Sequence, residues 1–556
     1  MKTKIRNKFT TKKIIGILSL CIILFGGLYS CEDDFLEKKP FDAISDAAVW
    51  VDVTLVEAYV NYTYSLSRAG WYGNSWMDIS SDDGHGIEKP SAHLIQRGEV
   101  TPSNMGYLGY PWSWYWSQIT YCNRFFDNVA GENLDALNDQ NKAKVDRMIG
   151  EMKFLRAYSY FRLSAFHGGV PLITKSFKLG EDYMVERDSY DEVLEFVLKE
   201  LDEAAALLPL SYSGATDRGR ITKGAALAIK SRALLYAASP LFNPQNEVSK
   251  WQKAADAAKA VIDLNVYSLH PDYKEAFTEK GNWNKEFIWV YIPNQGLKSN
   301  NEYRIERKLF PNGSQGWSHP SPTQNLIDCY ETLNGLLPKD DPTYDPQNPF
   351  VNRDPRFYAS ILYDGAPWQG RELETFLPGG KDSPQGNEGW NASWTGYNIR
   401  KYVDESIKVP SNTATSNPHW PYIRYGEILL NYAEAQFHLG HEDIAREYLN
   451  KVRSRPSVKM PNITDIGINL EKRIINERRI ELYCEEHRFL DIRRWKIVVD
   501  DSLYRMNITK NLSTGHKTYF ITPLMDFNLP ERMLLAPIPQ SEREKNPNLE
   551  QNPGYN

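Results

Sequence analysis

The sequence predicts a mostly α-helical protein in which about four helix pairs form a superhelical scaffold, with a loop-rich lobe that contains small β elements. Apolar residues recur at helical spacing in two blocks of the chain, and the helices come in pairs separated by turns. Between residues 270 and 420 the composition changes to Gly, Pro, Asn and Trp, which is typical of irregular structure.

The composition is that of an ordinary globular protein. Of the 556 residues, 41% are hydrophobic and 24% are charged, which allows a large core. The formal net charge is −6, and it becomes more negative when the basic first thirty residues are left out. A net-acidic chain of this kind is a poor candidate for binding nucleic acid or anionic membranes.

Residues 1–30 predict a secretory signal. A basic start precedes an apolar run over residues 14–29, which is shorter than the roughly 20 residues that cross a bilayer. A short N-terminal anchor helix is the alternative. Leu28-Tyr29-Ser30-Cys31 resembles the bacterial lipobox. This resemblance implies cleavage before Cys31 and acylation of that cysteine, so that the mature protein is anchored to a membrane and otherwise soluble.

The acidic residues that follow Cys31 bear on where the protein is located in the cell. Glu32-Asp33-Asp34 resembles the acidic tag that directs lipoproteins of Bacteroidetes-type bacteria to the cell surface. Three cysteines remain in the body of the chain, Cys122, Cys329 and Cys484. They are far apart and odd in number, so we expect buried free thiols and neither a disulfide framework nor a CxxC metal site.

Four helix pairs follow from the apolar periodicity. They cover residues 55–64 with 112–126, 151–166 with 188–201, 222–238 with 251–262, and 422–439 with 442–452. The first helix of the second pair ends at Gly168-Gly169, and its partner starts near Asp188 as a predicted N-cap.

The paired helices are typical of tetratricopeptide units, which join two helices by a short turn and place small residues in the second. Within residues 251–262, the small Ala254, Ala255, Ala257 and Ala258 permit close helix approach. An irregular helical bundle is the alternative that the pattern leaves open.

The stretch from residue 270 to 420 predicts a lobe of loops and small sheets packed on the helices. Short strand-like runs occur at residues 287–291 and 357–363. Long irregular segments are usually functional or disordered, and the aromatic content of this one argues against disorder.

Several motifs, in this order and spacing, make the chain resemble the SusD/RagB surface lipoproteins. Besides the lipobox and the acidic tag, the matching motifs are Glu151-x-x-Phe154-Leu155-Arg156-Ala157, Gly168-Gly169-Val170-Pro171, Lys223-Gly224-Ala225-Ala226, Pro322-Thr323, Asp328-x-Tyr330, Arg353-Asp354-Pro355-Arg356, Glu477-Arg478-Arg479, Arg488-Phe489-x-Asp491 and Leu535-x-Pro537-Ile538-Pro539.

The resemblance implies a division into residues 1–30 as leader, 31–275 as an N-terminal SusD-like helical region, and 276–556 as a RagB/SusD region. The last region would comprise a variable lobe at 276–420 and C-terminal helix pairs at 421–556. The family also implies no catalysis and no cofactor, capture of oligosaccharides outside the cell, and a SusC-like TonB-dependent outer-membrane barrel as partner. Some relatives bind peptides, so a RagB-type peptide ligand stays an alternative.

A neutral sugar presents a flat C–H face and a rim of hydroxyls, so its site needs exposed aromatic rings and a few polar groups. We therefore expect ligand contacts from aromatic residues in polar loops. Trp317 is the first candidate, because it lies in a Gly- and Ser-rich segment just before Pro322-Thr323. The further candidates are Trp71, Tyr72 and Trp76 with the nearby Asp82 and Asp83, and Trp283, Trp368, Trp390 and Trp394 in the variable lobe.

Other conspicuous residues are interpreted as structural. Trp289 is expected in a buried strand, and Trp112, Trp114 and Trp116 are expected in the core. The charged run over residues 477–494 is expected to form one helix whose opposite charges pair three or four residues apart, and no ligand is assigned to it. Asp82-Asp83-Gly84-His85 is interpreted as a turn, and no metal site is expected there or at Asp340, Asp341 and Asp345.

Two other function classes remain open. A glycoside hydrolase would need a carboxylate pair some 5 to 10 Å apart, which the sequence cannot reveal. A protein-binding scaffold without a small ligand is the third class. No GxSxG, HExxH, phosphate-loop or zinc pattern is found in the sequence.

Overall fold

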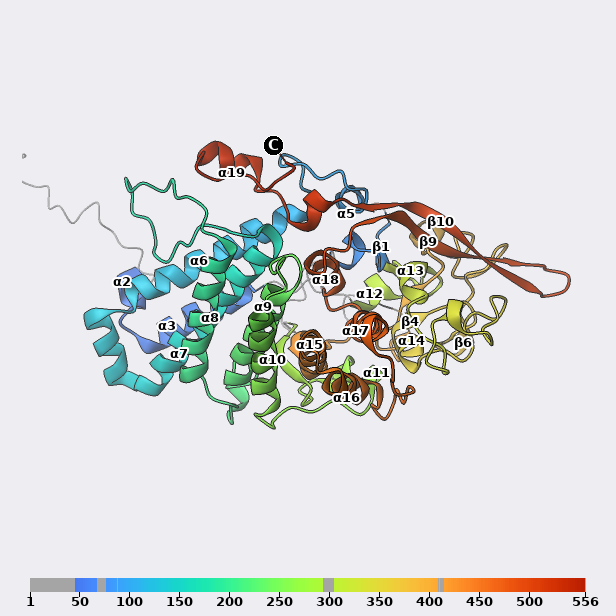
Figure 1. Cartoon of the computed structure of the whole chain (residues 1–556), viewed down its shortest axis with the longest axis horizontal. Helices are drawn as coiled ribbons and strands as arrows, with labels where there is room; N and C mark the ends of the chain where they lie inside the picture. The colour runs from blue at the N-terminus through green and yellow to red at the C-terminus, as the bar shows by residue number, and fades with distance from the viewer. Residues whose placement is uncertain are drawn as a thin grey trace, which may run out of the picture.

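The computed structural model describes residues 46–67, 77–87, 89–293, 305–408, 410 and 415–555 (Figure 1). The predicted leader, the lipidation site Cys31, and the candidates Trp71, Tyr72 and Trp76 lie outside the described residues. The helices fill one side and the centre of Figure 1, and the irregular lobe lies at the other end. The mostly α-helical fold with a loop-rich lobe is confirmed.

The first helices are α2 (Asp46–Val49), α3 (Val53–Ser65), α5 (Pro90–Gln96) and α6 (Gly109–Asn128). Asp52 caps α3 by accepting hydrogen bonds from the backbone N–H groups of Thr54 and Leu55. Of the three tryptophans of α6 that were expected in the core, Trp112 is buried, whereas Trp114 and Trp116 are half-buried.

The second pair consists of α7 (Gly131–His167), which is kinked at Asn141, and α8 (Tyr190–Leu207). The predicted N-cap of α8 was one residue off. Ser189 and Glu192 form a capping box there, whereas the Asp188 carboxylate accepts a 2.6 Å hydrogen bond from the backbone N–H of Leu172. Asp188 therefore ties the segment after α7 to the start of α8.

The third pair is α9 (Lys223–Ala238) with α10 (Val248–Ile262), and the fourth is α15 (Tyr425–His438) with α16 (Glu442–Arg453). Four of the five alanines of α10 are buried, namely Ala254, Ala255, Ala257 and Ala258, as the close approach of helices requires. Helix α10 packs on α15, although residues 263–424 separate them in the chain. The helical stack is thus continuous across the inserted lobe.

The described residues of the lobe take part in four small antiparallel sheets. Strand β2 (Phe287–Tyr291) pairs with β8 (Trp420–Arg424), and β1 (Gly84–His85) pairs with β3 (Ser321–Pro322). The other two are β4 (Ile361–Leu362) with β7 (Asn398–Ile399), and β5 (Pro367–Trp368) with β6 (Arg371–Glu372). The short helices here are α11 (Tyr273–Ala276), α12 (Ile305–Leu309), α13 (Gln324–Ile327) and α14 (Pro355–Ser360).

Two sequence predictions were wrong at the edges of this lobe. Residues 355–360 form α14, so only the end of the expected strand at 357–363 is extended. Tyr422, expected as the first residue of a helix, lies on β8 instead. In both places the apolar run is short, and such runs fit a strand and a helix equally well.

The C-terminal part comprises α17 (Gly467–Glu481), α18 (Arg488–Arg494), the strands β9 (Val499–Lys510) and β10 (Lys517–Leu529), and α19 (Gln540–Lys545). The β9–β10 hairpin extends along the lobe in Figure 1. The charged run at 477–494 was predicted as one helix, and this was wrong, because residues 482–487 separate α17 from α18.

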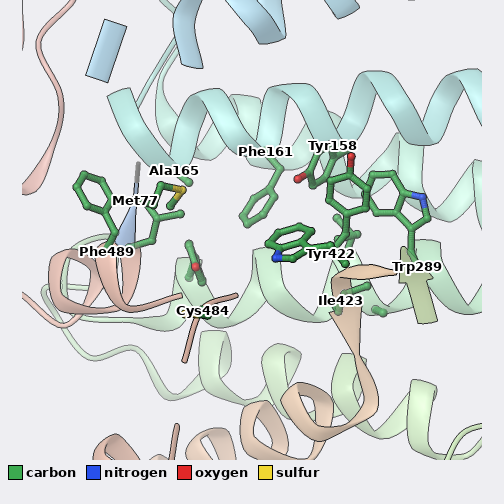
Figure 2. Close-up of a cluster of buried hydrophobic side chains, with 14 of the residues drawn as sticks. Met77, Tyr158, Phe161, Ala165, Trp289, Tyr422, Ile423, Cys484 and Phe489 are labelled. Carbon is green, nitrogen blue, oxygen red and sulfur yellow. The ribbon is translucent and has the colours of Figure 1, made fainter. Parts of the chain in front are cut away.

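An aromatic cluster joins the helical stack to the lobe (Figure 2). Tyr158 of α7 meets the edge of Trp289 at a ring-centre distance of 4.9 Å, and Trp289 stacks on Tyr422 at 4.0 Å. Trp289 is only 3% exposed, which confirms its predicted place in a buried strand. Because these rings come from α7, β2 and β8, the cluster fixes the lobe to the helices.

The charged side chains of α17 form a buried network with distant partners. Glu481 accepts hydrogen bonds from Arg356, Arg424 and Arg455 at 2.8 to 2.9 Å, and all four side chains are at most 1% exposed. Although burial alone raises the pKa of Glu481, the three guanidinium groups lower it well below its ordinary value. The network is therefore a permanently charged part of the core, as the structural interpretation of these residues requires.

Cys122, Cys329 and Cys484 are free thiols, as predicted; Cys122 and Cys484 are buried and Cys329 is half-buried. Within the described part of the chain, no helix is both long and apolar enough to cross a membrane.

Candidate ligand-binding surface

The tryptophans predicted to contact ligand differ strongly in exposure. Trp390 is 74% exposed, Trp394 45% and Trp283 38%, and Trp317 is half-buried. Trp368 is only 1% exposed, its indole N–H donates a 2.9 Å hydrogen bond to Ser314 Oγ, and its ring packs edge-on against Phe310. Trp368 is thus a core residue, and its predicted contact with ligand was wrong because both faces of its ring are covered.

Asp82 and Asp83 are also buried. The Asp82 carboxylate accepts hydrogen bonds from Arg488 Nε and Nη2, both at 2.8 Å, and Asp83 pairs with Arg479. Burial alone would raise the pKa of Asp82, but the positive charges of Arg479 and Arg488 have the larger effect, so the pKa lies below its ordinary range. These carboxylates link the β1 segment to α17 and α18, so the structure gives them a role in packing in place of the predicted ligand contact.

The pairing of β1 with β3 positions the first candidate loop. Gly84 is opposite Pro322 and His85 is opposite Ser321. The Thr323 hydroxyl donates a 2.6 Å hydrogen bond to the backbone carbonyl of Asp82. Trp317 lies four residues before β3, so two segments distant in sequence are brought side by side. The expected turn at residues 82–85 is instead a bend that enters a strand.

Trp394 stands on this same framework. Its ring is stacked on His85 with ring centres 5.6 Å apart, and His85 stacks in turn on His93 at 5.0 Å. Burial, and to a lesser extent His93, lowers the pKa of His85 to about 3. The histidine under the Trp394 ring is therefore neutral at neutral pH, and the stack is apolar in character.

Trp390 joins the group through two short 3₁₀ helices, η6 (Asn312–Ser314) and η8 (Gly389–Asn391), which contact each other. Asn312 Nδ2 donates a 2.8 Å hydrogen bond to the backbone carbonyl of Asn387 and thereby holds the η8 loop. The Arg307 guanidinium lies 5.8 Å from the centre of the Trp317 ring. We call Trp317, Trp390 and Trp394 together the tryptophan surface.

Trp283 does not belong to the tryptophan surface. It lines a cavity between the segment before α9 and strand β2, together with Arg218 and His419. The sequence did not predict His85 and Arg307, which support Trp394 and Trp317 respectively. Nothing in the local sequence marks either residue, because the contacts depend on the β1–β3 pairing and on the position of α12.

No group of three or more metal-ligating side chains with suitable geometry occurs among the described residues. Asp341, one of the three aspartates for which no metal site is expected, accepts hydrogen bonds from Asn334 and Thr343 within its own loop. The side chains of the tryptophan surface offer aromatic faces, with the Arg307 guanidinium near Trp317, which suits a ligand with a flat apolar face and polar edges.

The comparisons with known proteins agree with this architecture. The model described as "SusD family" matches residues 285–555, and the model described as "Starch-binding associating with outer membrane" matches residues 34–235. The chain is a member of the SusD/RagB family.

Three similar proteins illustrate the membership. A SusD-like protein, P38, of Formosa agariphila is 26% identical and aligns with 88% of this chain and 92% of its own length. The crystal structure of a SusD-like protein from Bacteroides fragilis is 28% identical, with a TM-score of 0.78, and the match covers 93% of this chain and 100% of that one.

A SusD-like carbohydrate-binding protein, also from Bacteroides fragilis, is 28% identical with a TM-score of 0.75, over 90% of this chain and 100% of its own. These matches cover both the helical stack and the lobe of this SusD/RagB protein. They concern fold and family, whereas the ligand has to be argued from the side chains.

Proposed function

We propose that this SusD/RagB protein is a glycan-binding lipoprotein of the cell surface that captures oligosaccharides by aromatic stacking and delivers them to a SusC-like TonB-dependent transporter. The observation that carries the proposal is the tryptophan surface. Large indole rings are left 74% and 45% exposed on loops that hydrogen bonds and ring stacking hold in place. The carbohydrate-binding relative from Bacteroides fragilis supports a sugar as the ligand.

The physical basis is the match between an indole and a sugar ring. Each stacked ring removes apolar surface from water on both sides, and a rigid aromatic side chain loses little conformational entropy in doing so. The loops are already ordered by Asn312 and by the stack under Trp394, so little further ordering is needed on binding. The ligand is neutral in this proposal, so its affinity should depend little on salt.

The membrane part of the proposal relies on the sequence and on the family. The apolar leader and Cys31 support a lipid anchor, and the acidic residues after Cys31 support export to the cell exterior. The matched family model is described as associating with the outer membrane. Trp71, Tyr72 and Trp76 remain predicted ligand contacts, and they lie outside the described residues.

Affinity electrophoresis through gels that contain neutral polysaccharides tests the proposal. A form that starts after Cys31 is run against a panel of glycans, as wild type and as Trp317→Ala. We expect wild type to be retarded by at least one glycan and Trp317→Ala to lose most of that retardation. Tyr183→Ala is the matched control, because Tyr183 is an exposed aromatic residue outside the tryptophan surface.

Equal retardation of wild type and Trp317→Ala by every glycan that retards wild type would refute the assigned surface. Absence of any retardation of wild type would favour a peptide ligand or a protein-binding scaffold. Release of soluble sugar from a polysaccharide would favour the hydrolase class.

A further inference from the structure

A cavity of about 200 Å³ lies between residues 210–222, which precede and begin α9, and the segment that forms β2. It shares no lining residue with the tryptophan surface. Ligand pockets for drug-sized molecules measure about 300 to 1,000 Å³, so this cavity suits one sugar ring better than an oligosaccharide.

The charges that line the cavity are all positive. Its lining residues include Arg218 and Arg220 but no aspartate or glutamate. Arg220 is neutralised from outside the cavity, by Asp217 at 2.8 Å, Glu57 at 3.1 Å and Glu151 at 3.4 Å. Arg218 is exposed and has no carboxylate partner among the described residues. An anion is therefore the complementary ligand for this guanidinium.

Trp283 forms an aromatic wall beside Arg218. It is 38% exposed, and the Arg218 guanidinium lies 4.7 Å from its ring centre. The backbone of Trp283 has φ +65°, in the left-handed region where bulky residues are outliers. Strained conformations of this kind are found preferentially at functional sites.

His419 contributes an unused hydrogen-bonding atom. Its ring meets Trp283 edge-on at 4.3 Å, it lines the cavity, and it is 4% exposed. Its Nδ1 atom has no hydrogen-bond partner among the described residues, which is unusual for a buried polar atom. Burial, together with the nearby Arg218, lowers the pKa of His419 to about 4, so the ring is neutral at neutral pH and can exchange a hydrogen bond with a hydroxyl.

We propose that this cavity is a second saccharide site, separate from the tryptophan surface, and that it binds a single sugar residue that carries an anionic group. Arg218 pairs with the anionic group, Trp283 contacts the sugar ring, and His419 supplies a hydrogen-bonding group. The proposal rests on the proposed function insofar as the ligand is a sugar. The second site extends the proposed ligands to acidic sugars, for which the tryptophan surface has no selectivity.

Isothermal titration of the full chain in detergent tests the proposal with four probes: glucuronate, glucose 6-sulfate, glucose and acetate. We expect glucuronate or the sulfated sugar to bind, and glucose and acetate to bind at least tenfold more weakly, because each lacks one of the two recognised features. The carboxylated and sulfated arms decide which anionic group the cavity prefers. Raised ionic strength should weaken the binding of the acidic sugar, since the Arg218 contact is partly exposed.

The variants are Arg218→Gln and Trp283→Ala, with Lys285→Gln and Tyr183→Ala as matched controls. Lys285 is an exposed cation two residues from Trp283, and Tyr183 is an exposed aromatic residue that belongs to neither site. We expect Arg218→Gln and Trp283→Ala to weaken the acidic sugar at least tenfold, and the controls to change it less than twofold. Far-ultraviolet circular dichroism of each variant verifies folding.

Three results would overturn the second site: no binding of either acidic sugar by wild type, unchanged binding by a folded Arg218→Gln variant, or acetate binding as tightly as glucuronate. The two proposals fail independently. Loss of neutral-glycan retardation in Trp317→Ala with intact glucuronate binding supports both sites. Glucuronate binding that depends on Arg218, in a protein that no neutral polysaccharide retards, supports the cavity and refutes the tryptophan surface.

Discussion

The charged network around α17 and the tryptophan surface differ in burial and in how their side chains are satisfied. In the network, Glu481 and its three arginines are at most 1% exposed, and each carboxylate oxygen of Glu481 accepts at least one hydrogen bond. On the tryptophan surface, Trp390 and Trp394 leave large apolar areas in water. Glu481 of α17 and its arginine partners are thus part of the protein core, whereas Trp390 and Trp394, of a residue type that is usually buried, are exposed to solvent.

The difference indicates which residues to test for function. A buried charged group whose hydrogen bonds and ion pairs are all made within the protein has no donor or acceptor free for a ligand. An exposed aromatic ring on an ordered loop can still gain the free energy of burying its apolar surface when a ligand covers it. Mutations in the network should therefore change stability, and mutations on the tryptophan surface should change binding.

The largest effect is expected for Glu481→Ala. This change leaves Arg356, Arg424 and Arg455 buried without one of their shared partners. Removing one member of a buried ion pair costs about 3 to 5 kcal/mol, so the free energy of unfolding in urea should fall by that amount. Lys142→Ala is the control, because its pair with Asp146 is exposed and worth less than about 0.5 kcal/mol. If Glu481→Ala lowers the free energy of unfolding by less than about 1 kcal/mol, burial of this ion-pair network does not determine its contribution to stability.

The next effect concerns Glu486, a buried carboxyl that is not fully paired. Its Oε2 lies 3.5 Å from Arg162, and its Oε1 has no hydrogen-bond partner among the described residues. Burial raises its pKa from 4.5 to about 7, against the opposing effect of Arg162 and Arg232. Because the folded protein holds this proton more tightly, the stabilisation is complete below pH 4.5 and is lost as the pH rises through about 7.

Glu486→Gln should remove this pH dependence. The wild type should lose on the order of 3 kcal/mol relative to the variant between about pH 4 and pH 8, as measured by urea unfolding across that range. Parallel stability curves for the two proteins would mean that the pKa of Glu486 is the same in the folded and unfolded states.

The smallest free-energy change is expected for Trp394→Ala, and it should appear in binding. Loss of one stacking ring should weaken the glycan that retards wild type by about tenfold, or about 1.4 kcal/mol. The midpoint of thermal unfolding should change little, since the ring is 45% exposed. A large fall in that midpoint with unchanged affinity would instead make the His85–Trp394 stack a part of the core.

The sequence predicts the helical stack well because each helix carries its own periodicity and end signals. Thr222 caps α9, and Gly168 ends α7 with φ +75°, and both signals are local. The lobe is less predictable, since its sheets pair residues that are distant in the chain. The pairing of His85 with Ser321 leaves no trace in either segment.

The candidate site was predictable only in kind. Aromatic residues in polar loops stay the predicted type of ligand contact, and Trp317, Trp390 and Trp394 lie on segments that the β1–β3 pairing, the η6–η8 contact and the His85 stack connect. Sequence spacing could not distinguish them from Trp368, which has similar neighbours in sequence but is covered by Phe310 and tied to Ser314. Whether a loop tryptophan is buried depends on the folded structure. In a loop, the sequence has no apolar periodicity from which burial could be predicted.

The direct packing of α10 on α15, across the insertion of residues 263–424, has an evolutionary consequence. Because α10 and α15 contact each other directly, changes confined to exposed loops of the insertion leave the interface between these two helices intact. During evolution, the exposed loops of the lobe can therefore change in sequence and length while the helical stack is retained.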